Sequence, residues 1–169
     1  MSKTESSEMK SWAIVNISVC NLRQSADYDA GMASQGLLGM PVKILNHDGW
    51  YEVETPDEYR AWVQGSAIQQ VTKSELDAWN HAPQVVVTSV YGFVYSKPNN
   101  KSQTVSDVVA SDRFKLLGTK KDFYHVAYPD GRTGYLSKKD GEKVDKWRKH
   151  LKQDAQSIIE TGKGDPLRE

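Results

Sequence analysis

Hydrophobic and polar residues alternate over several short stretches of this chain. A period of two marks β-strands that bury one face. The alternating positions are Val15, Ile17, Val19, Val42, Ile44, Tyr51, Val53, Tyr124 and Val126. Glycine, proline, asparagine and aspartate interrupt these stretches at short intervals, as tight turns require. The pattern therefore predicts a mainly β protein built from small barrels.

The strand pattern occurs twice. Residues 50–57 and 123–130, which lie 73 positions apart, both follow the sequence aromatic-Tyr-x-Val-x-x-Pro-Asp. Upstream, residues 42–45 match 114–117 at a distance of 72, so the second copy has gained one residue in the intervening loop. Such self-similarity indicates one supersecondary unit built twice.

One difference between the copies falls in a turn. In the second copy Pro129-Asp130-Gly131 is a strong hairpin signal, because glycine adopts the left-handed conformation without strain. The first copy has Glu58 in place of Gly131. We therefore expect Glu58 either to accept a positive φ or to use another turn.

Two segments have helical patterns. Thr72 and Glu75 fit a capping box at the start of a short linker helix that Pro83 ends. Towards the C-terminus an apolar stripe has helical spacing. Its residues are Val144, Trp147, Leu151, Ala155, Ile158 and Ile159. Two outcomes remain open for this stripe: it packs back onto the barrels, or it begins a further domain. Asp154 could instead cap a separate last helix.

These patterns divide the chain into five segments. They are a disordered N-terminal segment (1–11), a first small-barrel domain (12–71), a helical linker (72–84), a second small-barrel domain (85–140) and a C-terminal helical segment (141–169).

Composition narrows the class of protein. The chain is 38% hydrophobic and 26% charged, with zero net charge, which is typical of a globular protein and argues against a nucleic-acid partner. We expect no membrane span, since no apolar run approaches the required length, and residues 1–8 show no secretory leader. Between Trp12 and Val71 the net charge is −4, and between Val85 and Lys138 it is +4. The two halves could attract each other, the second could meet an anionic partner, or both could be solvated surfaces.

Residues suited to chemistry are scarce. Known nucleophile, zinc and phosphate-loop motifs are missing, and the four histidines are far apart in sequence. The single cysteine, Cys20, lies within a predicted strand, which favours a structural role over that of a nucleophile. We therefore expect no catalytic residue, no metal site and no cofactor.

Aromatic residues are the remaining feature. Tyr91, Phe93 and Tyr95 share one face of a strand. Together with Trp79 and Trp147 they are candidates for a domain interface, because a small barrel cannot bury every large ring.

Several segments of the sequence resemble a known protein family. Residues 21–23, 35–42, 49–51 and 59–63 resemble the bacterial SH3-like (SH3b) domain. Residues 91–93, 102–107 and 128–135 resemble its companion domain. The pair is similar to the N-terminal half of NlpC-type cell-wall cysteine peptidases, the dipeptidyl-peptidase VI group. Residues 155–161 resemble the opening helix of that family's catalytic domain, whose Asp-Cys-Ser-Gly motif this chain lacks.

The resemblance implies a function. The family cleaves peptidoglycan stem peptides between γ-D-glutamate and a diamino acid when their N-terminal L-Ala is free, and its first SH3-like domain limits substrate length. Our first hypothesis is a non-catalytic module that docks on an NlpC-type catalytic domain in the same parent chain and shapes substrate selection in the bacterial cell envelope or periplasm. The alternative is an independent SH3-like module for wall-derived or Pro-rich peptides. A hydrolase that uses Cys20 is the third hypothesis.

The resemblance also implies substrate-binding residues. Tyr59 matches a family tyrosine that follows the Pro-Asp turn, and Trp62 lies on the strand behind it. The family carries a glutamate where this chain has Gly31, so the carboxylate expected to meet the substrate amine is missing unless Glu58, Asp27 or Asp29 replaces it. The predicted site comprises Tyr59, Trp62, Gly31 and Glu58.

Overall fold

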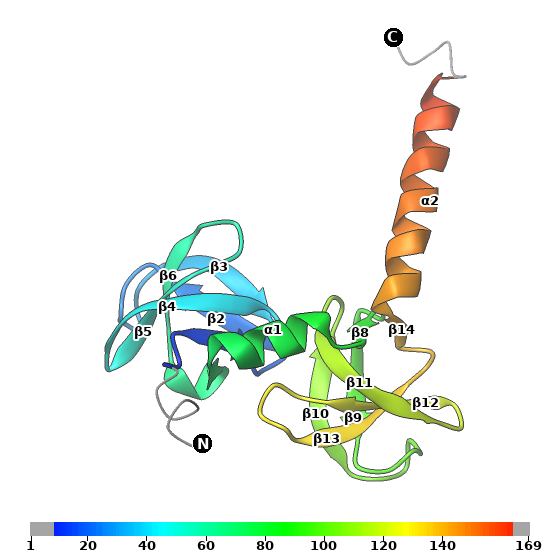
Figure 1. Cartoon of the computed structure of the whole chain (residues 1–169), viewed down its shortest axis with the longest axis horizontal. Helices are drawn as coiled ribbons and strands as arrows, with labels where there is room; N and C mark the ends of the chain where they lie inside the picture. The colour runs from blue at the N-terminus through cyan, green and yellow to red at the C-terminus, as the bar shows by residue number, and fades with distance from the viewer. Residues whose placement is uncertain (1–8, 164–169) are drawn as a thin grey trace.

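The chain folds into two small β units joined by a helix. The computed structural model describes residues 9–163, so most of the N-terminal segment expected to be disordered lies outside the described residues. Figure 1 shows the two units on either side of helix α1 (Lys73–His81), with a second helix, α2 (Val144–Lys163), beyond the second unit.

Each unit contains seven strands. The first unit holds β1 (Trp12–Val15), β2 (Val19–Arg23), β3 (Met32–Leu37), β4 (Pro41–Asp48), β5 (Trp50–Glu54), β6 (Arg60–Val63), the 3-10 turn η1 (Gly65–Ala67) and β7 (Ile68–Val71). The second unit holds β8 (Gln84–Val87), β9 (Tyr91–Tyr95), β10 (Thr104–Val109), β11 (Arg113–Lys120), β12 (Phe123–Ala127), β13 (Thr133–Ser137) and β14 (Gly141–Lys143).

The topology confirms the repeat. The strand orders are β3-β2-β6-β5-β4-β1-β7 and β10-β9-β13-β12-β11-β8-β14, which are the same arrangement displaced by seven strands. Both orders are open, so the strongly bent sheets are SH3-like without forming the closed barrels that the strand pattern suggested. A bulge interrupts β4–β5 after Ile44 and β11–β12 after Leu116. One residue separates β4 from β5 and two separate β11 from β12, which accounts for the change in repeat distance.

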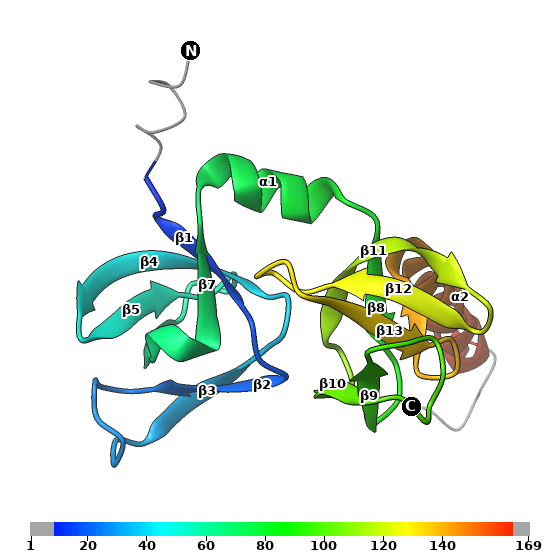
Figure 2. The same cartoon turned by 90° about the horizontal axis from the view of Figure 1, so that it is seen from below.

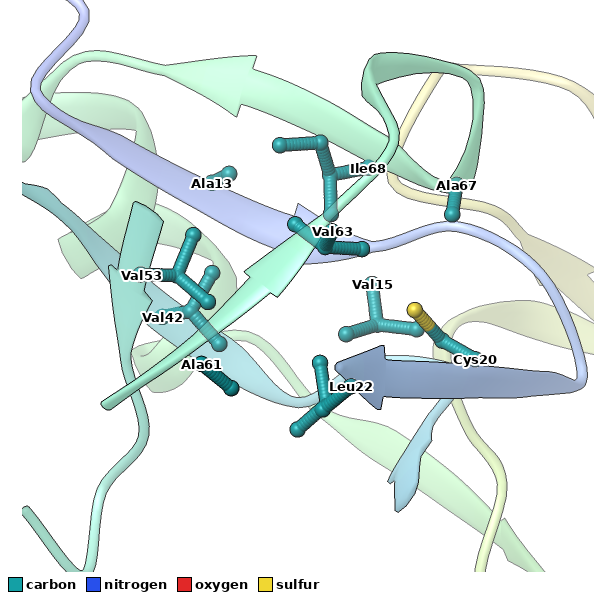
Figure 3. Packing of buried hydrophobic residues seen from close by; sticks show 10 residues of the cluster. All are labelled: Ala13, Val15, Cys20, Leu22, Val42, Val53, Ala61, Val63, Ala67 and Ile68. Carbon is teal, nitrogen blue, oxygen red and sulfur yellow. The ribbon is translucent and has the colours of Figure 1, made fainter. Parts of the chain in front are cut away.

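Each unit buries its own apolar core. Figure 3 shows the first core, to which most of the strands of that unit and η1 contribute side chains. Its members are Ala13, Val15, Cys20, Leu22, Val42, Val53, Ala61, Val63, Ala67 and Ile68. The strand period places these residues on one face, and burial of that face is the main stabilising term for such a small unit.

The linker helix forms as predicted. Thr72 Oγ1 accepts a hydrogen bond from the backbone N–H of Glu75, and the Glu75 carboxylate accepts one from the N–H of Thr72. This capping box satisfies two of the free donors at the helix start. Leu76 and Trp79 are buried against Ile14 of β1, so α1 is fixed to the first unit.

Helix α2 tests whether the apolar stripe packs back onto the two β units. It is one continuous helix, so a separate helix beginning at Asp154 is wrong. Val144 is buried and Trp147 is half-buried, but residues 148–158 are all exposed. Leu151 exposes 47% of its surface and Ile158 63%. Between residues 148 and 158 the stripe does not pack on the two units, and Figure 1 shows the helix projecting away from them; the side chain of Ile159 lies outside the described residues.

The two units meet at a short contact, here called the seam. It joins Leu38 and Gly39, between β3 and β4, to Asp112 and Arg113, at the start of β11. Leu38 belongs to the first unit by sequence, but its side chain packs into the core of the second, where it is 1% exposed. Figure 2 shows the two sheets side by side beneath α1.

Backbone groups hold the seam in register. The N–H of Leu38 donates to Asp112 Oδ1 at 3.1 Å, and its carbonyl accepts from the N–H of Arg113 at 2.8 Å. Gly39 has a φ of +92°, and an added Cβ would lie 2.7 Å from the carbonyl oxygen of Arg113, so only glycine fits there. The Trp79 indole donates to the Gly39 carbonyl and thereby ties α1 to the same point.

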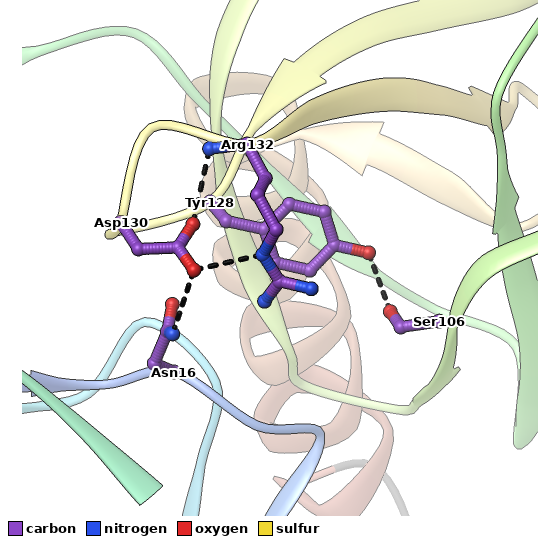
Figure 4. A network of polar contacts seen from close by, with 5 residues as sticks. All are labelled: Asn16, Ser106, Tyr128, Asp130 and Arg132. Atoms are coloured by element: carbon purple, nitrogen blue, oxygen red, sulfur yellow. Dashed lines mark hydrogen bonds and ion pairs between the residues drawn. The ribbon is translucent and has the colours of Figure 1, made fainter. Parts of the chain in front are cut away.

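Polar side chains extend this contact. Asn16 Nδ2 donates to Asp130 at 3.0 Å, and Ser18 donates to Asp107 at 3.2 Å. Figure 4 shows Asp130 held in turn by Arg132. Burial alone would raise the pKa of Asp130, but the hydrogen bonds from Asn16 and Arg132 outweigh it and lower that pKa. Among residues 9–163 no ion pair crosses the seam. The opposite net charges of the two halves therefore form no direct ion pair between the units in this part of the chain.

Candidate functional site

The β5–β6 turn of the first unit carries two of the predicted substrate-binding residues. Thr55 closes the turn: its hydroxyl accepts from the N–H of Tyr59 at 3.0 Å, and its N–H donates to the Tyr59 carbonyl. Glu58 has a φ of +66°, the strained alternative that the sequence left open. The turn holds Tyr59 at the surface, 51% exposed.

The strand register brings Trp62 and the Gly31 loop to the same end of the sheet. Arg23, the last residue of β2, pairs with Trp62 of β6. Beyond Arg23 the chain turns back, and the N–H of Gln24 donates to the Gly31 carbonyl at 2.9 Å. Because β2 and β6 are antiparallel, this loop lies beside the start of β6, where Tyr59 is found.

Glu58 contributes to a groove that the other three predicted residues do not line. This groove of about 330 Å³ lies on the side of α1, and Trp12, Glu54 and Lys73 also line it. The strand register thus brings the Gly31 loop and the start of β6 together, whereas Glu58 contributes to a groove that Gly31, Tyr59 and Trp62 do not line. None of the grooves found in residues 9–163 encloses Tyr59 or Trp62.

Gly31 leaves room for a side chain. A Cβ built at this position would lie 2.9 Å from the Oε1 atom of Gln24, which is the far end of a flexible side chain. The φ of Gly31 lies outside the left-handed region. A larger residue can therefore replace Gly31 if Gln24 adopts another rotamer.

Tyr28 is a surface aromatic that was not among the residues predicted from the sequence. It is 70% exposed and meets Trp50 edge to face, with ring centroids 5.2 Å apart. The two rings line a cleft of about 200 Å³ with Arg23 and Cys20. The position of Tyr28 in a polar loop after a strand was the available signal.

Cys20 is a poor nucleophile in this setting. It is 1% exposed, and burial raises the pKa of its thiol to about 11. At neutral pH the sulfur is protonated, and the thiolate is the reactive form. The structure thus favours the structural role that the sequence suggested. Residues 9–163 also contain no cluster of three or more metal-ligating side chains.

The interface candidates fall into two groups. Trp79 lies where α1 meets the seam, and Trp147 lies under the guanidinium of Arg113, 5.7 Å from the ring centroid. Tyr91, Phe93 and Tyr95 make ring contacts with one another and with Phe123, all within the second unit. These three rings remain a prediction for contact with another domain.

The comparisons with known proteins agree with this architecture. Residues 22–68 match the family described as bacterial dipeptidyl-peptidase Sh3 domain, and residues 89–142 match the bacterial SH3 domain family. The chain therefore carries two bacterial SH3 domains in tandem, one in each unit.

Longer proteins contain segments that are similar to most of this chain. A putative N-acetylmuramoyl-L-alanine amidase, YrvJ of Bacillus subtilis, is 23% identical over 142 residues, which is 80% of this chain and 27% of that protein. The crystal structure of an NlpC/P60 family protein from Bacillus cereus superposes with a TM-score of 0.66 at 20% identity, over 79% of this chain and 56% of the other.

A third relative is more distant. An NlpC/P60 endopeptidase from Photobacterium damselae has a TM-score of 0.52 at 14% identity, over 76% of this chain and 31% of the other. At these identities the two solved structures establish the fold. This chain spans about a quarter of the length of the Bacillus subtilis protein.

The described residues contain no helix long and apolar enough to cross a membrane.

Proposed function

We propose that this chain is the non-catalytic tandem SH3-like module of a cell-wall cysteine peptidase. In this proposal the module docks on an NlpC-type catalytic domain of its parent protein in the cell envelope and helps to select peptidoglycan stem peptides with a free N-terminal L-Ala-γ-D-Glu. The observation that carries the proposal is the match of residues 22–68 to the dipeptidyl-peptidase Sh3 domain family.

That match covers the surface on which a substrate would be recognised. It includes the Gly31 loop, the Tyr59 turn and Trp62. A free ammonium group is bound by aromatic faces and by carboxylates. In this proposal Tyr59 and Trp62 supply the aromatic faces. The carboxylate that binds the ammonium group comes from Asp27, Asp29 or Glu58, or it is missing because position 31 is a glycine.

Helix α2 supports the docking part of the proposal. An amphipathic helix derives most of its stability from burial of its apolar face, yet Leu151 and Ile158 are exposed. A catalytic domain that covers these residues would bury the stripe. The Trp147 ring near the base of the helix lies 5.7 Å from the Arg113 guanidinium, so this end of α2 contacts the second unit.

Replacement of Gly31 by glutamate tests the recognition surface. A charge-assisted hydrogen bond contributes about 1.5–3 kcal/mol, which is a change of roughly 10- to 150-fold in affinity. We expect Gly31→Glu to raise the affinity for L-Ala-γ-D-Glu-diamino acid peptide by that factor, measured by titration calorimetry. In a chain extended by a catalytic domain, kcat/KM should rise likewise.

The N-acetylated form of the same peptide is the control, because it lacks the ammonium group. It should gain little from Gly31→Glu. Equal gains for both peptides, or no gain for the free amine, would remove this surface from substrate recognition. Binding of Pro-rich peptides alone would favour the independent module.

The proposal also predicts that the chain by itself releases no product from the stem peptide, since the Cys20 thiol stays protonated. Turnover that disappears in Cys20→Ala would contradict it.

A further inference from the structure

A groove of about 450 Å³ runs along the seam between the two units. Its apolar part is formed by Leu37, Met40, Pro41 and Trp79. Its volume lies within the range of small-ligand sites. The lining of the groove includes Pro56 of the β5–β6 turn, but not Gly31, Tyr59 or Trp62.

The groove has an unbalanced charge. Its lining residues, all within residues 9–163, include Arg113 as the one cation and no carboxylate. Arg113 is half-buried, and none of the ion pairs found in that part of the chain involves it. A partly desolvated guanidinium with no counter-ion favours an anionic ligand.

The surroundings of Arg113 add to this imbalance. Burial lowers the pKa of its guanidinium, and the nearby charge of Arg148 lowers it further. The guanidinium carbon lies over the Trp147 ring, 5.7 Å from its centroid. A guanidinium whose face meets an aromatic ring can still bind a carboxylate at its edge, through two parallel N–H hydrogen bonds.

Neutral polar groups complete the lining. Asn80, Gln84 and Gln35 bring side-chain amides to the groove. The Gln84 amide nitrogen already donates to the Trp79 carbonyl, so the position of this side chain is fixed. Amides beside an apolar floor suit a peptide backbone, which offers both donors and acceptors.

We propose that the seam groove is a second ligand site, which binds a short apolar peptide ending in a free carboxylate, with the carboxylate at Arg113 and an apolar side chain against Met40 and Trp79. Residues of both units form this site, so it exists only while the seam is closed. The proposal is independent of the substrate surface around Tyr59.

The test is a titration of the full chain with acetyl-alanyl-leucine, as the free acid and as the C-terminal amide. It is followed through the tryptophan indole N–H signals in two-dimensional NMR. We expect the acid to shift the signals of Trp79 and Trp147 and to leave Trp50 and Trp62 unchanged. The amide should bind about tenfold or more weakly, because it lacks the charge.

Variants at one position define the role of the cation. Arg113→Gln keeps the Cβ that packs on Gly39 and the backbone N–H that bonds Leu38, so the seam should persist. It should lower the affinity for the acid to that for the amide, whereas Arg113→Lys should retain part of the preference. Lys115→Gln on the same strand removes one exposed charge and should leave both affinities unchanged.

Three results would overturn the proposal. They are equal affinities for acid and amide, an acid affinity unaffected by Arg113→Gln, and shifts confined to Trp50 and Trp62. The last result would place peptide binding in the first unit, so it would leave the proposed function standing while removing the seam site.

Discussion

Leu38 is the residue whose replacement tests the seam most severely. Leu38→Ala removes a side chain that is 1% exposed and packs with Val85, Phe114 and Leu136 in the second core. Buried leucine-to-alanine changes cost about 2–5 kcal/mol, because the transfer energy of the lost atoms adds to that of the cavity. Leu38→Ala keeps the backbone hydrogen bonds to Asp112 and Arg113. We therefore expect the loss in the free energy of unfolding to lie in the lower half of this range.

The loss of stability in Leu38→Ala should appear in the second unit. Although Leu38 lies in the first half of the sequence, Leu38→Ala should accelerate hydrogen exchange in β8, β11 and β13 of the second unit. Urea unfolding of the full chain, followed by tryptophan fluorescence, measures the total loss.

Leu117→Ala is the matched control. Leu117 is 45% exposed on β11, so its truncation should cost less than about 1 kcal/mol. A loss for Leu38→Ala as small as that of Leu117→Ala, or faster exchange confined to β1–β7, would refute the assignment of Leu38 to the second core.

Further predictions concern a carboxyl group, a turn and a helix. Burial, opposed by hydrogen bonds from two backbone N–H groups, raises the pKa of Asp112 to about 7 from 3.8. Folding then retains a proton that the unfolded chain loses, so stability should fall by up to about 4 kcal/mol as pH rises from about 4 to 7. Asp112→Asn should flatten this slope in urea midpoints measured at several pH values, and an unchanged slope would contradict the assignment. Glu58→Gly should raise stability by about 0.5–1 kcal/mol, since glycine relieves the positive φ at some cost in chain entropy, and a lower melting temperature would count against strain at this turn. Amides of residues 148–158 should exchange faster than those of β12, and equal protection would mean that α2 is covered.

Local patterns predicted most of the fold. The aromatic-Tyr-x-Val-x-x-Pro-Asp repeat identified two equal units, and the capping box at Thr72 identified the linker helix. Such features depend on residues close together in sequence, where strand period, turn chemistry and caps act directly. The strain at Glu58 followed from comparison with Gly131, which has a φ of +91°.

The seam could not be predicted in the same way. Nothing near Leu38 in sequence shows that its side chain enters the core of the other unit, because that contact joins segments about 75 residues apart. The open form of the two sheets depends on long-range pairing as well. For the candidate site, sequence supplied Tyr59, Trp62 and Gly31 through resemblance, whereas Tyr28 and the position of Glu58 required the structure.

The central claim is that the tandem module recognises cell-wall material. Its most direct test is co-sedimentation of the purified full chain with isolated peptidoglycan, followed by competition with soluble L-Ala-γ-D-Glu-diamino acid peptide. We expect the chain to sediment with the wall material and the free-amine peptide to release it. A chain that remains in the supernatant at every concentration of peptidoglycan would contradict the claim.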